Sequence, residues 1–315
     1  MKLLISIIGP TAVGKSNLSV DVAKAWGAPV ISADSVQIFR GLNIGSGKVT
    51  PEEMQGVPHY MLDIIDPTES YSAGRFGREV DALLPKLFEK HEVVILTGGA
   101  GFYFHAVWNG MDDIPETDPK IRAELNDRLA LEGLGALVAE LEVCDPVAHG
   151  KVDLQNPVRV IRALEVFHST GTPISVYQNQ NIKENKDYAE LRIGLEMDRE
   201  LLYERINLRV EKMVEAGLED EVLQLADQHG ADAKGLQSVG YREFVDCLKG
   251  LHDKTEAVRL IQRNSRRYAK RQYTWFRKAE GIEWFPVDDQ EAIRHRIKAV
   301  ITEMKDKENA EDEAE

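Results

Sequence analysis

The fold of this chain is indicated by one stretch near its start, Leu3-Leu4-Ile5-Ser6-Ile7-Ile8-Gly9-Pro10-Thr11-Ala12-Val13-Gly14-Lys15-Ser16. Its first part is apolar and predicts a buried strand, and its second part matches the pattern G-x-x-x-x-G-K-[ST]. The apolar pattern of a helix follows, at Leu18, Val20, Val22 and Ala23. The order of strand, glycine-rich loop and helix predicts a phosphate-binding loop.

Each residue type in this loop has a physical role. Gly9 and Gly14 allow a tight turn whose N–H groups point inward, and the next helix adds its positive N-terminal dipole. Lys15 would place a positive charge between two linked phosphates, and the Ser16 hydroxyl would hold a Mg²⁺ on the same oxygens. The alternative is a structural turn without a ligand, which does not require Lys and Ser at these positions. We therefore expect a diphosphate or nucleotide to be bound by Gly9, Pro10, Thr11, Ala12, Val13, Gly14, Lys15 and Ser16.

Composition and charge are those of an ordinary soluble protein of 315 residues with a formal net charge of −14. This charge argues against nucleic-acid binding by the whole surface, but charge is segregated along the chain. Residues 259–278 contain eight Lys or Arg and no acid, whereas residues 303–315 contain seven acids. Cys144 and Cys247 form no C-x-x-C, and the apolar N-terminus is too short for a signal peptide or a membrane span. We expect a cytoplasmic protein without a membrane segment.

A carboxylate follows the second expected strand. That strand covers Pro29–Ala33, and Asp34 comes directly after it. Because chemistry in open α/β sheets sits at the carboxyl ends of strands, Asp34 is expected beside the phosphate loop, where it would accept a proton from a bound substrate. A helix N-cap is an equal alternative on the local sequence. A third strand, His91–Leu96, ends without the aspartate of a Walker B motif, which disfavours a motor or switch ATPase.

The alternation of elements predicts an α/β fold: a P-loop NTPase-like parallel sheet flanked by helices, with an inserted all-helical domain and C-terminal helices. We place the first part of the core at residues 1–112 and the insertion at 113–187, ending in a polar run at 179–187. Residues 188–290 would complete the core with basic helices, and residues 291–315 would form a terminal helix and a disordered acidic tail. In the insertion, Arg159, Arg162 and Glu165 share a helix face, where solvated charge is an equal alternative to binding.

The helix expected from Lys254 to Arg277 is the second informative stretch. One face carries cations at spacings of three and four: Arg259, Arg263, Arg266, Arg267 and Lys270. The interleaved aromatic residues are Tyr268, Tyr273, Trp275 and Phe276, of which we expect the last two to be core residues. A cationic helix with stackable rings is typical of binding to a phosphate backbone with unstacked bases. Together with the phosphate loop, it indicates an enzyme that uses a diphosphate or nucleotide and acts on RNA.

The chain resembles the tRNA dimethylallyltransferases, also called tRNA isopentenyltransferases, up to about Pro286. Besides Gly9–Ser16, the resemblance rests on Asp34–Arg40, Ile44–Lys48, Gly98–Tyr103, Arg159–Val166, Arg209–Met213, Val239–Glu243 and Tyr268–Arg277. This family transfers a prenyl group to N6 of the adenosine that follows the tRNA anticodon. The resemblance implies dimethylallyl diphosphate as donor, the anticodon stem-loop of tRNA as acceptor and Mg²⁺ as cofactor, and we expect a monomer.

The resemblance also implies roles for individual residues. Lys15 and Arg209 would bind the diphosphate and stabilise it as it leaves, Ser16 would hold the metal, and Asp34 would take the N6 proton. Flipping the adenine out of its loop costs a few kcal/mol, which contacts with tRNA would offset. Those contacts are implied at Asp34, Ser35, Val36, Gln37, Ala100, Arg122, Val158, Arg159, Arg162, Gln237, Gly240, Tyr241, Arg242, Lys270, Arg271, Gln272 and Arg277.

Three positions depart from the family pattern. Ala100 stands where the family usually has Thr near the acceptor base, Leu154-Gln155-Asn156 stands in place of Pro-Asn-Asp, and Phe39 replaces a more usual Tyr. Because the loss of one uncharged hydrogen bond costs about 0.5–1.5 kcal/mol, we expect an active enzyme despite Ala100.

Three alternative functions stay open. The first is an adenylate isopentenyltransferase, against which the insertion and the basic helix argue. The second is a small-molecule P-loop kinase, because such kinases also place an Asp after the second strand. The third is a catalytically weak tRNA-binding paralogue, which Ala100 suggests.

Overall fold

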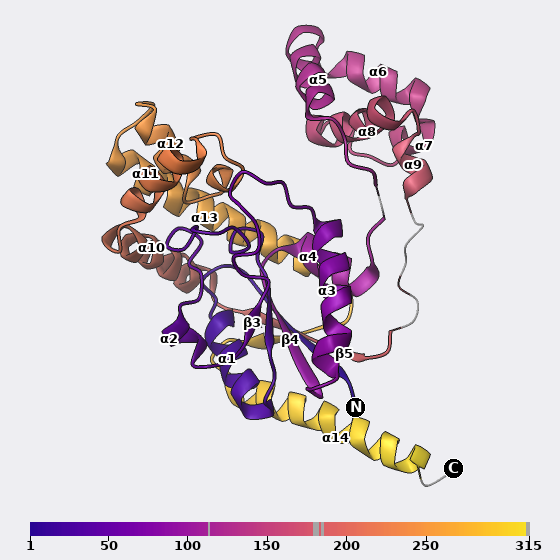
Figure 1. Ribbon diagram of the computed structural model, residues 1–315, viewed down its shortest axis with the longest axis vertical. Helices are drawn as coiled ribbons and strands as arrows, with labels where there is room; N and C mark the ends of the chain where they lie inside the picture. The colour runs from indigo at the N-terminus through magenta and orange to yellow at the C-terminus, as the bar shows by residue number, and fades with distance from the viewer. Residues whose placement is uncertain (113, 179–182, 184–185, 313–315) are drawn as a thin grey trace. The chain divides into compact units, whose positions relative to one another are not determined.

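The computed structural model describes residues 1–112, 114–178, 183 and 186–312. The chain divides into two compact units: Met1–Val107 with Asn185–Glu315, called here the core unit, and Trp108–Glu184, called the helical unit. Figure 1 shows the elements of each. Most of the polar run expected at 179–187, and the last three residues of the acidic tail, lie outside the described residues.

Among the described residues, the core unit contains a six-stranded parallel sheet in the order β3-β2-β4-β1-β5-β6. The strands are β1 (Leu3–Ile8), β2 (Val30–Ala33), β3 (His59–Tyr60), β4 (Val93–Gly98), β5 (Ala189–Glu196) and β6 (Ile282–Pro286). In the centre, Ile8 of β1 lies opposite Gly98 of β4 and Gly194 of β5. Every residue of β1 is buried, as a sequence that is apolar except at Ser6 predicts for a parallel sheet covered on both faces.

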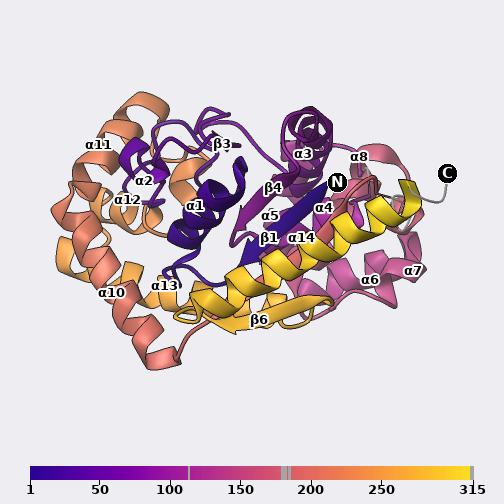
Figure 2. The same ribbon diagram turned by 90° about the horizontal axis from the view of Figure 1, so that it is seen from below.

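Helices cover the sheet. Apolar residues of α1 (Lys15–Trp26) and α14 (Gln290–Asp312) share one buried cluster with Ile5 of β1. Figure 2 shows α14 running alongside the sheet. The helix α3 (Ala73–Phe88) packs against β4, and α4 (Gly101–Asn109) approaches α3 closely where Gly77 meets Ala106. A short helix, α2 (Pro51–Met54), precedes β3.

The remaining helices of the core unit follow β5 and lie together in Figure 1. They are α10 (Arg199–Glu215), α11 (Leu218–His229), the 3-10 turn η1 (Gly235–Gln237), α12 (Arg242–Leu248) and α13 (Lys254–Phe276). Asp253 caps α13 by accepting a hydrogen bond from the Glu256 N–H at 2.8 Å. Phe276 is fully buried, which confirms it as a core residue, whereas Trp275 is half-buried. The long helix α13 packs against both α10 and α12.

The helical unit has its own core. Its helices are α5 (Pro119–Glu132), α6 (Leu134–Cys144), α7 (Pro146–His149), α8 (Pro157–Thr170) and α9 (Ile174–Tyr177), and their buried residues include Leu125, Leu137, Leu141 and Leu164. Asn156 caps α8, because its Oδ1 accepts a hydrogen bond from the Val158 N–H at 3.1 Å. Although Leu154-Gln155-Asn156 departs from the family pattern, Asn156 still supplies the N-cap of this helix.

Strand β4 differs from the prediction. It covers Val93–Gly98 instead of His91–Leu96, because parallel pairing with β1 continues to the Ile8–Gly98 pair. Gly98, the last residue of β4, therefore lies opposite Ile8, the last residue before the phosphate loop.

The acidic C-terminal stretch also differs. We expected a terminal helix followed by a disordered tail, but α14 begins at Gln290 and continues through Asp312, well into the acidic stretch. Ile293, Ile297 and Ile301, spaced by four, anchor this helix in the core, and Glu308 accepts a hydrogen bond from the N-terminal amino group at 2.8 Å. None of the described helices is long and apolar enough to cross a bilayer. Cys144 and Cys247 are free cysteines.

Candidate functional site

The phosphate loop, residues 9–16, follows β1 at the carboxyl edge of the sheet. Gly9 and Gly14 have φ angles of 152° and 114°, which L side chains rarely adopt. A side chain at Gly9 would also meet the Leu195 carbonyl oxygen at 3.0 Å. No described side chain caps α1, which begins at Lys15, so its first N–H groups can serve a bound anion.

Lys15 carries the first of two charges at this loop. It is partly buried, and its Nζ donates a hydrogen bond to the Pro10 carbonyl at 2.7 Å. Burial lowers the pKa of Lys15 to about 7; Asp34 acts to raise it and Arg209 to lower it. The three charged groups therefore lie within electrostatic reach of one another. An anion placed beside Lys15 would favour its protonated form.

Arg209 of α10 carries the second charge. Its Nη1 donates to Thr11 Oγ1 and its Nη2 to the Ser46 carbonyl, both at 3.3 Å. Burial lowers the pKa of Arg209, while Asp34 raises it. In the part of the chain that the structure describes, neither Arg209 nor Lys15 forms an ion pair with a carboxylate. Two cations held by neutral oxygens beside one glycine-rich loop make a site for an anion.

Asp34 follows β2, closes the turn after this strand and adds a negative charge near the phosphate loop. Its Oδ1 accepts hydrogen bonds from the N–H groups of Val36 at 2.8 Å and Gln37 at 3.3 Å. These bonds close a turn that no helix follows, so the alternative of a helix N-cap is wrong, and Asp34 caps a turn instead. The second oxygen, Oδ2, accepts neither bond. Burial raises the pKa values of Tyr103 and Tyr268, and the charge of Asp34 raises them further.

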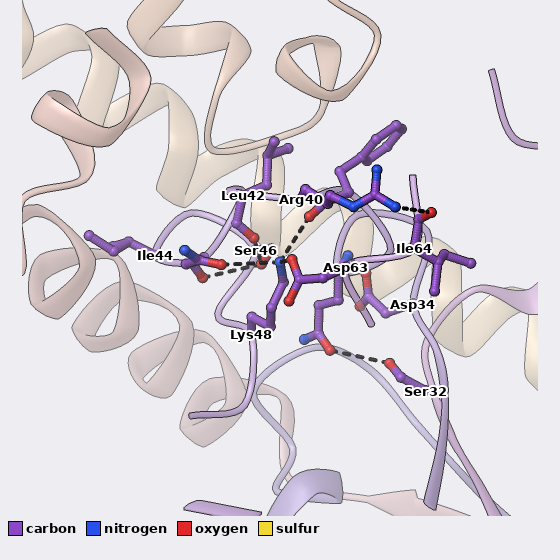
Figure 3. A network of polar contacts seen from close by, with 12 residues as sticks. Ser32, Asp34, Arg40, Leu42, Ile44, Ser46, Lys48, Asp63 and Ile64 are labelled. Carbon is purple, nitrogen blue, oxygen red and sulfur yellow. Dashed lines mark hydrogen bonds and ion pairs between the residues drawn. The ribbon is translucent and has the colours of Figure 1, made fainter. Parts of the chain in front are cut away.

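The loop 43–47 runs beside this turn (Figure 3). Lys48, at its end, is only 8% exposed, and its Nζ donates to the Phe39 carbonyl at 2.8 Å and to Asn43 Oδ1 at 3.1 Å. It also forms an ion pair with Asp63 at 2.5 Å. Because a carboxylate neutralises Lys48, this lysine supports the loop and adds little to the anion site.

Gln272 of α13 links two loops. Its Oε1 accepts a hydrogen bond from the Thr11 N–H at 2.9 Å, and its Nε2 donates to the Gly99 carbonyl at 3.0 Å. Both polar atoms of the side-chain amide thus form hydrogen bonds within the protein, although the resemblance implies a tRNA contact for this residue. The Ala100 N–H donates to the Ala33 carbonyl at 3.1 Å, so the backbone here is held without a Thr hydroxyl.

A cavity of about 370 Å³ collects many of the expected residues in the core unit. Those that line it are Thr11, Asp34, Ser35, Val36, Arg209, Gln237, Gly240, Arg242 and Arg271. Ser238 and Val239 also line the cavity. The sequence did not indicate the other lining residues as site residues: Gly45, Ser46, Ile206, Val210, Met213, Ile261, Ser265 and Tyr268. The periodicity of α10 was an available signal, because Ile206, Val210 and Met213 recur on the face that carries Arg209.

Expected tRNA-contacting residues outside this cavity differ in exposure. Tyr241 is fully buried and its hydroxyl donates to Glu221 at 2.7 Å, so its side chain supports the fold from within. Lys270 and Arg277 are exposed on or just after α13. The basic face of α13 is neutralised in part at its start, because Arg259 pairs with Glu256 at 2.6 Å.

Four expected residues belong to the helical unit: Arg122, Val158, Arg159 and Arg162. Val158 and Arg159 are exposed. The carboxylate of Glu165 is buried, accepts a hydrogen bond from Thr117 at 2.5 Å, and lies 3.5 Å from Arg162 and 4.0 Å from Arg122. This face is therefore more than solvated charge, because its buried carboxylate pairs with Arg162 of the same face and with Arg122 of α5.

The fold and the site define a P-loop-type α/β protein in which Lys15 and Arg209 flank a candidate anion site and Asp34 lies nearby. A sequence model of the IPP transferase family matches residues 37–279, and the chain belongs to that family. This confirms the resemblance found in the sequence.

Individual relatives agree with this assignment. The tRNA dimethylallyltransferase of Cytophaga hutchinsonii is 45% identical over 302 residues, which cover 96% of this chain and 98% of the relative. That of Symbiobacterium thermophilum is 43% identical over 98% of this chain and 97% of the relative. The full-length tRNA isopentenylpyrophosphate transferase structure from Bacillus halodurans has a TM-score of 0.71 and 39% identity over 99% of both chains. A eukaryotic dimethylallyltransferase acting on tRNA has a TM-score of 0.76 and 26% identity, over 92% of this chain and 75% of its own.

Proposed function

We propose that this protein transfers the dimethylallyl group of dimethylallyl diphosphate to N6 of adenosine 37, the base 3′ to the anticodon, in tRNAs that read codons beginning with U. One observation carries the proposal: Lys15 and Arg209 lie at a glycine-rich loop, pair with no carboxylate among the described residues, and both have a pKa that the charge of Asp34 raises. A diphosphate would satisfy both cations. The named relatives are tRNA dimethylallyltransferases, which supports the choice of donor and acceptor.

In the proposed reaction the bond between C1 of the prenyl group and the diphosphate oxygen breaks, and a bond from N6 to C1 forms. The diphosphate leaves with the bonding electron pair. Lys15, Arg209 and the N-terminus of α1 stabilise this growing negative charge. The N6 lone pair is delocalised into the purine ring, so the amine is a weak nucleophile. Asp34 accepts the N6 proton as the new bond forms, and Oδ2 is the oxygen left for this step.

Mg²⁺ is part of the proposal. The described residues contain no group of three carboxylate, histidine or cysteine side chains that would hold a metal ion by themselves. Ser16 stands exposed in the first turn of α1, where its hydroxyl would hold the ion with phosphate oxygens of the donor, an arrangement that Mg²⁺ accepts readily. When bound there, the ion would neutralise charge on the diphosphate.

The acceptor side of the proposal uses the exposed cations. Arg242 and Arg271 line the cavity, whose volume lies in the range of about 300–1,000 Å³ usual for small-ligand sites and so suits a single flipped base. Arg159 of the helical unit and Lys270 of α13 are exposed and would contact phosphates. The proposed enzyme is a monomer in the cytoplasm.

The test is a comparison of acceptors. The protein is incubated with Mg²⁺, dimethylallyl diphosphate and either unmodified tRNA or AMP, or with ATP and candidate alcohols. We expect a mass increase of tRNA alone, mapped to adenosine 37 by nuclease digestion. Arg209→Ala should slow the reaction more than tenfold, whereas Arg199→Ala, on the same helix, should not. Prenylated AMP, a phosphorylated alcohol, or tRNA binding without transfer would each replace the proposal by one of the three alternatives.

A further inference from the structure

The loop 43–47 is held by a carboxylate on its outer side. Glu221, in the first turn of α11, accepts hydrogen bonds from three successive backbone N–H groups of this loop. The Asn43 and Ile44 N–H groups reach Oε2 at 3.1 and 2.8 Å, and the Gly45 N–H reaches Oε1 at 3.1 Å. Successive N–H groups turned to one side form a nest for an anion, and here the anion is the protein's own side chain.

Tyr241 completes this arrangement. Its hydroxyl donates to Glu221 Oε1 at 2.7 Å and accepts a hydrogen bond from the Ser46 N–H at 3.1 Å. The ring is fully buried and lies so close to Gly45 that a side chain there would collide with it. Glu221 and Tyr241 together therefore fix four consecutive N–H groups, from residue 43 to residue 46.

The other side of the same loop touches Arg209. The Ser46 carbonyl accepts one of the two hydrogen bonds of its guanidinium, and a side chain at Gly47 would collide with that guanidinium. The loop thus lies between Glu221 and Arg209. A carboxylate in direct contact with Arg209 would neutralise it, whereas a carboxylate behind the loop fixes the geometry and leaves the positive charge available to a ligand.

We propose that Glu221, with Tyr241, is a positioning residue of the anion site: it acts on a bound diphosphate through the loop 43–47 and Arg209. The inference rests on the proposed function for the identity of the anion. It assigns no contact between Glu221 and any substrate. Its consequence is that removal of the Glu221 charge weakens diphosphate binding while tRNA binding is unchanged.

The experiment measures binding of inorganic pyrophosphate with Mg²⁺ by calorimetry. In Glu221→Gln an amide NH₂ replaces one oxygen and faces N–H donors, so hydrogen bonds to a charged group are lost; we expect binding about tenfold weaker or more. The matched control is Glu219→Gln, in the same turn of α11, whose carboxylate pairs with exposed Lys254 and does not contact the loop. This control should bind pyrophosphate like the wild type. Tyr241→Phe is the second variant, with a smaller loss expected.

A double-mutant cycle distinguishes an effect of Glu221 on the position of Arg209 from a general destabilisation of the protein. If Glu221 acts through Arg209, then Glu221→Gln should cause no further loss of pyrophosphate binding in an Arg209→Ala background. In the transfer assay, Glu221→Gln should raise KM for dimethylallyl diphosphate and leave KM for tRNA unchanged. Additive losses, or equal losses of pyrophosphate and tRNA binding, would overturn the inference.

Failure of the inference and failure of the proposed function give different results. If the wild type prenylates tRNA and Glu221→Gln binds pyrophosphate normally, the inference is wrong and the function stands. If the wild type does not prenylate tRNA, the function is wrong, and the pyrophosphate cycle still decides whether Glu221 positions Arg209.

Discussion

Replacement of Lys15 by methionine should stabilise the protein in the absence of ligand. Burial lowers the pKa of Lys15 from 10.5 to about 7, and no carboxylate among the described residues pairs with it. At 1.36 kcal/mol per pKa unit, the full shift corresponds to about 5 kcal/mol of destabilisation below pH 7. Lys15 is only partly buried and its hydrogen bond to Pro10 would be lost, so we expect Lys15→Met to gain about 2 kcal/mol.

The pH dependence follows from the direction of the shift. Between pH 7 and pH 10.5 the unfolded chain holds a proton on Lys15 that the folded protein does not, so the stability of the wild type rises with pH in this window. The cost of the buried charge is fully present below pH 7. The gain in the free energy of unfolding from Lys15→Met should therefore be largest near pH 6.5 and should become smaller towards pH 10.

Urea unfolding of both proteins at pH 6.5 and pH 9.5 measures this difference. Tryptophan fluorescence is a suitable signal, because Trp26, Trp275 and Trp284 lie in the core unit. Lys24→Met is the control, since Lys24 is exposed on the same helix and should change stability by less than about 0.5 kcal/mol. Pyrophosphate with Mg²⁺ should stabilise the wild type and not Lys15→Met. A stability gain of Lys15→Met that is absent at pH 6.5, or constant with pH, would show that burial of the Lys15 charge does not destabilise the folded protein.

Three further outcomes are expected. Asp34→Asn keeps an oxygen for the turn after β2, so folding and tRNA affinity should persist while single-turnover transfer falls by roughly two to four orders of magnitude; near-normal transfer would leave Asp34 a purely structural role. Gln272→Leu leaves the Thr11 N–H and the Gly99 carbonyl without their hydrogen-bond partner. The free energy of unfolding in urea should therefore fall by about 2–4 kcal/mol, and an unchanged midpoint would contradict this. Lys270→Gln should reduce the slope of log tRNA affinity against log salt by about one unit or slightly less; an unchanged slope would assign Lys270 to solvent.

The parts of the fold that rest on local pattern were predictable. The strand before the phosphate loop, the loop itself and α13 each have a strong periodic or glycine signal, and the structure has elements at all three places. The C-terminal tail was not predictable in this way. Its acidic composition suggests disorder, but α14 begins with three isoleucines at helical spacing that are buried in the core, and the helix continues from them through the exposed residues that follow.

The residues of the candidate site were predictable only where they belong to a recognisable sequence motif. Lys15 and Asp34 belong to recognisable segments at strand ends, so the sequence could bring them together. Glu221 could not be found, because its importance comes from backbone N–H groups 176 to 178 positions away. The buried position of Tyr241 was missed for a related reason: exposure depends on how α11 and the loop 43–47 meet, and no local pattern encodes that contact.

The order of the strands also affects how the protein folds during synthesis. β1 is made first, yet its two neighbours are β4 and β5, and the whole helical unit is translated between them. At about 5–20 residues per second, the roughly ninety residues that separate β4 from β5 take on the order of ten seconds to appear. During that interval one edge of β1 lacks its partner, while the helical unit, which has a separate core, has time to fold. A nascent chain of this protein would therefore expose an open sheet edge to chaperones until β5 leaves the ribosome.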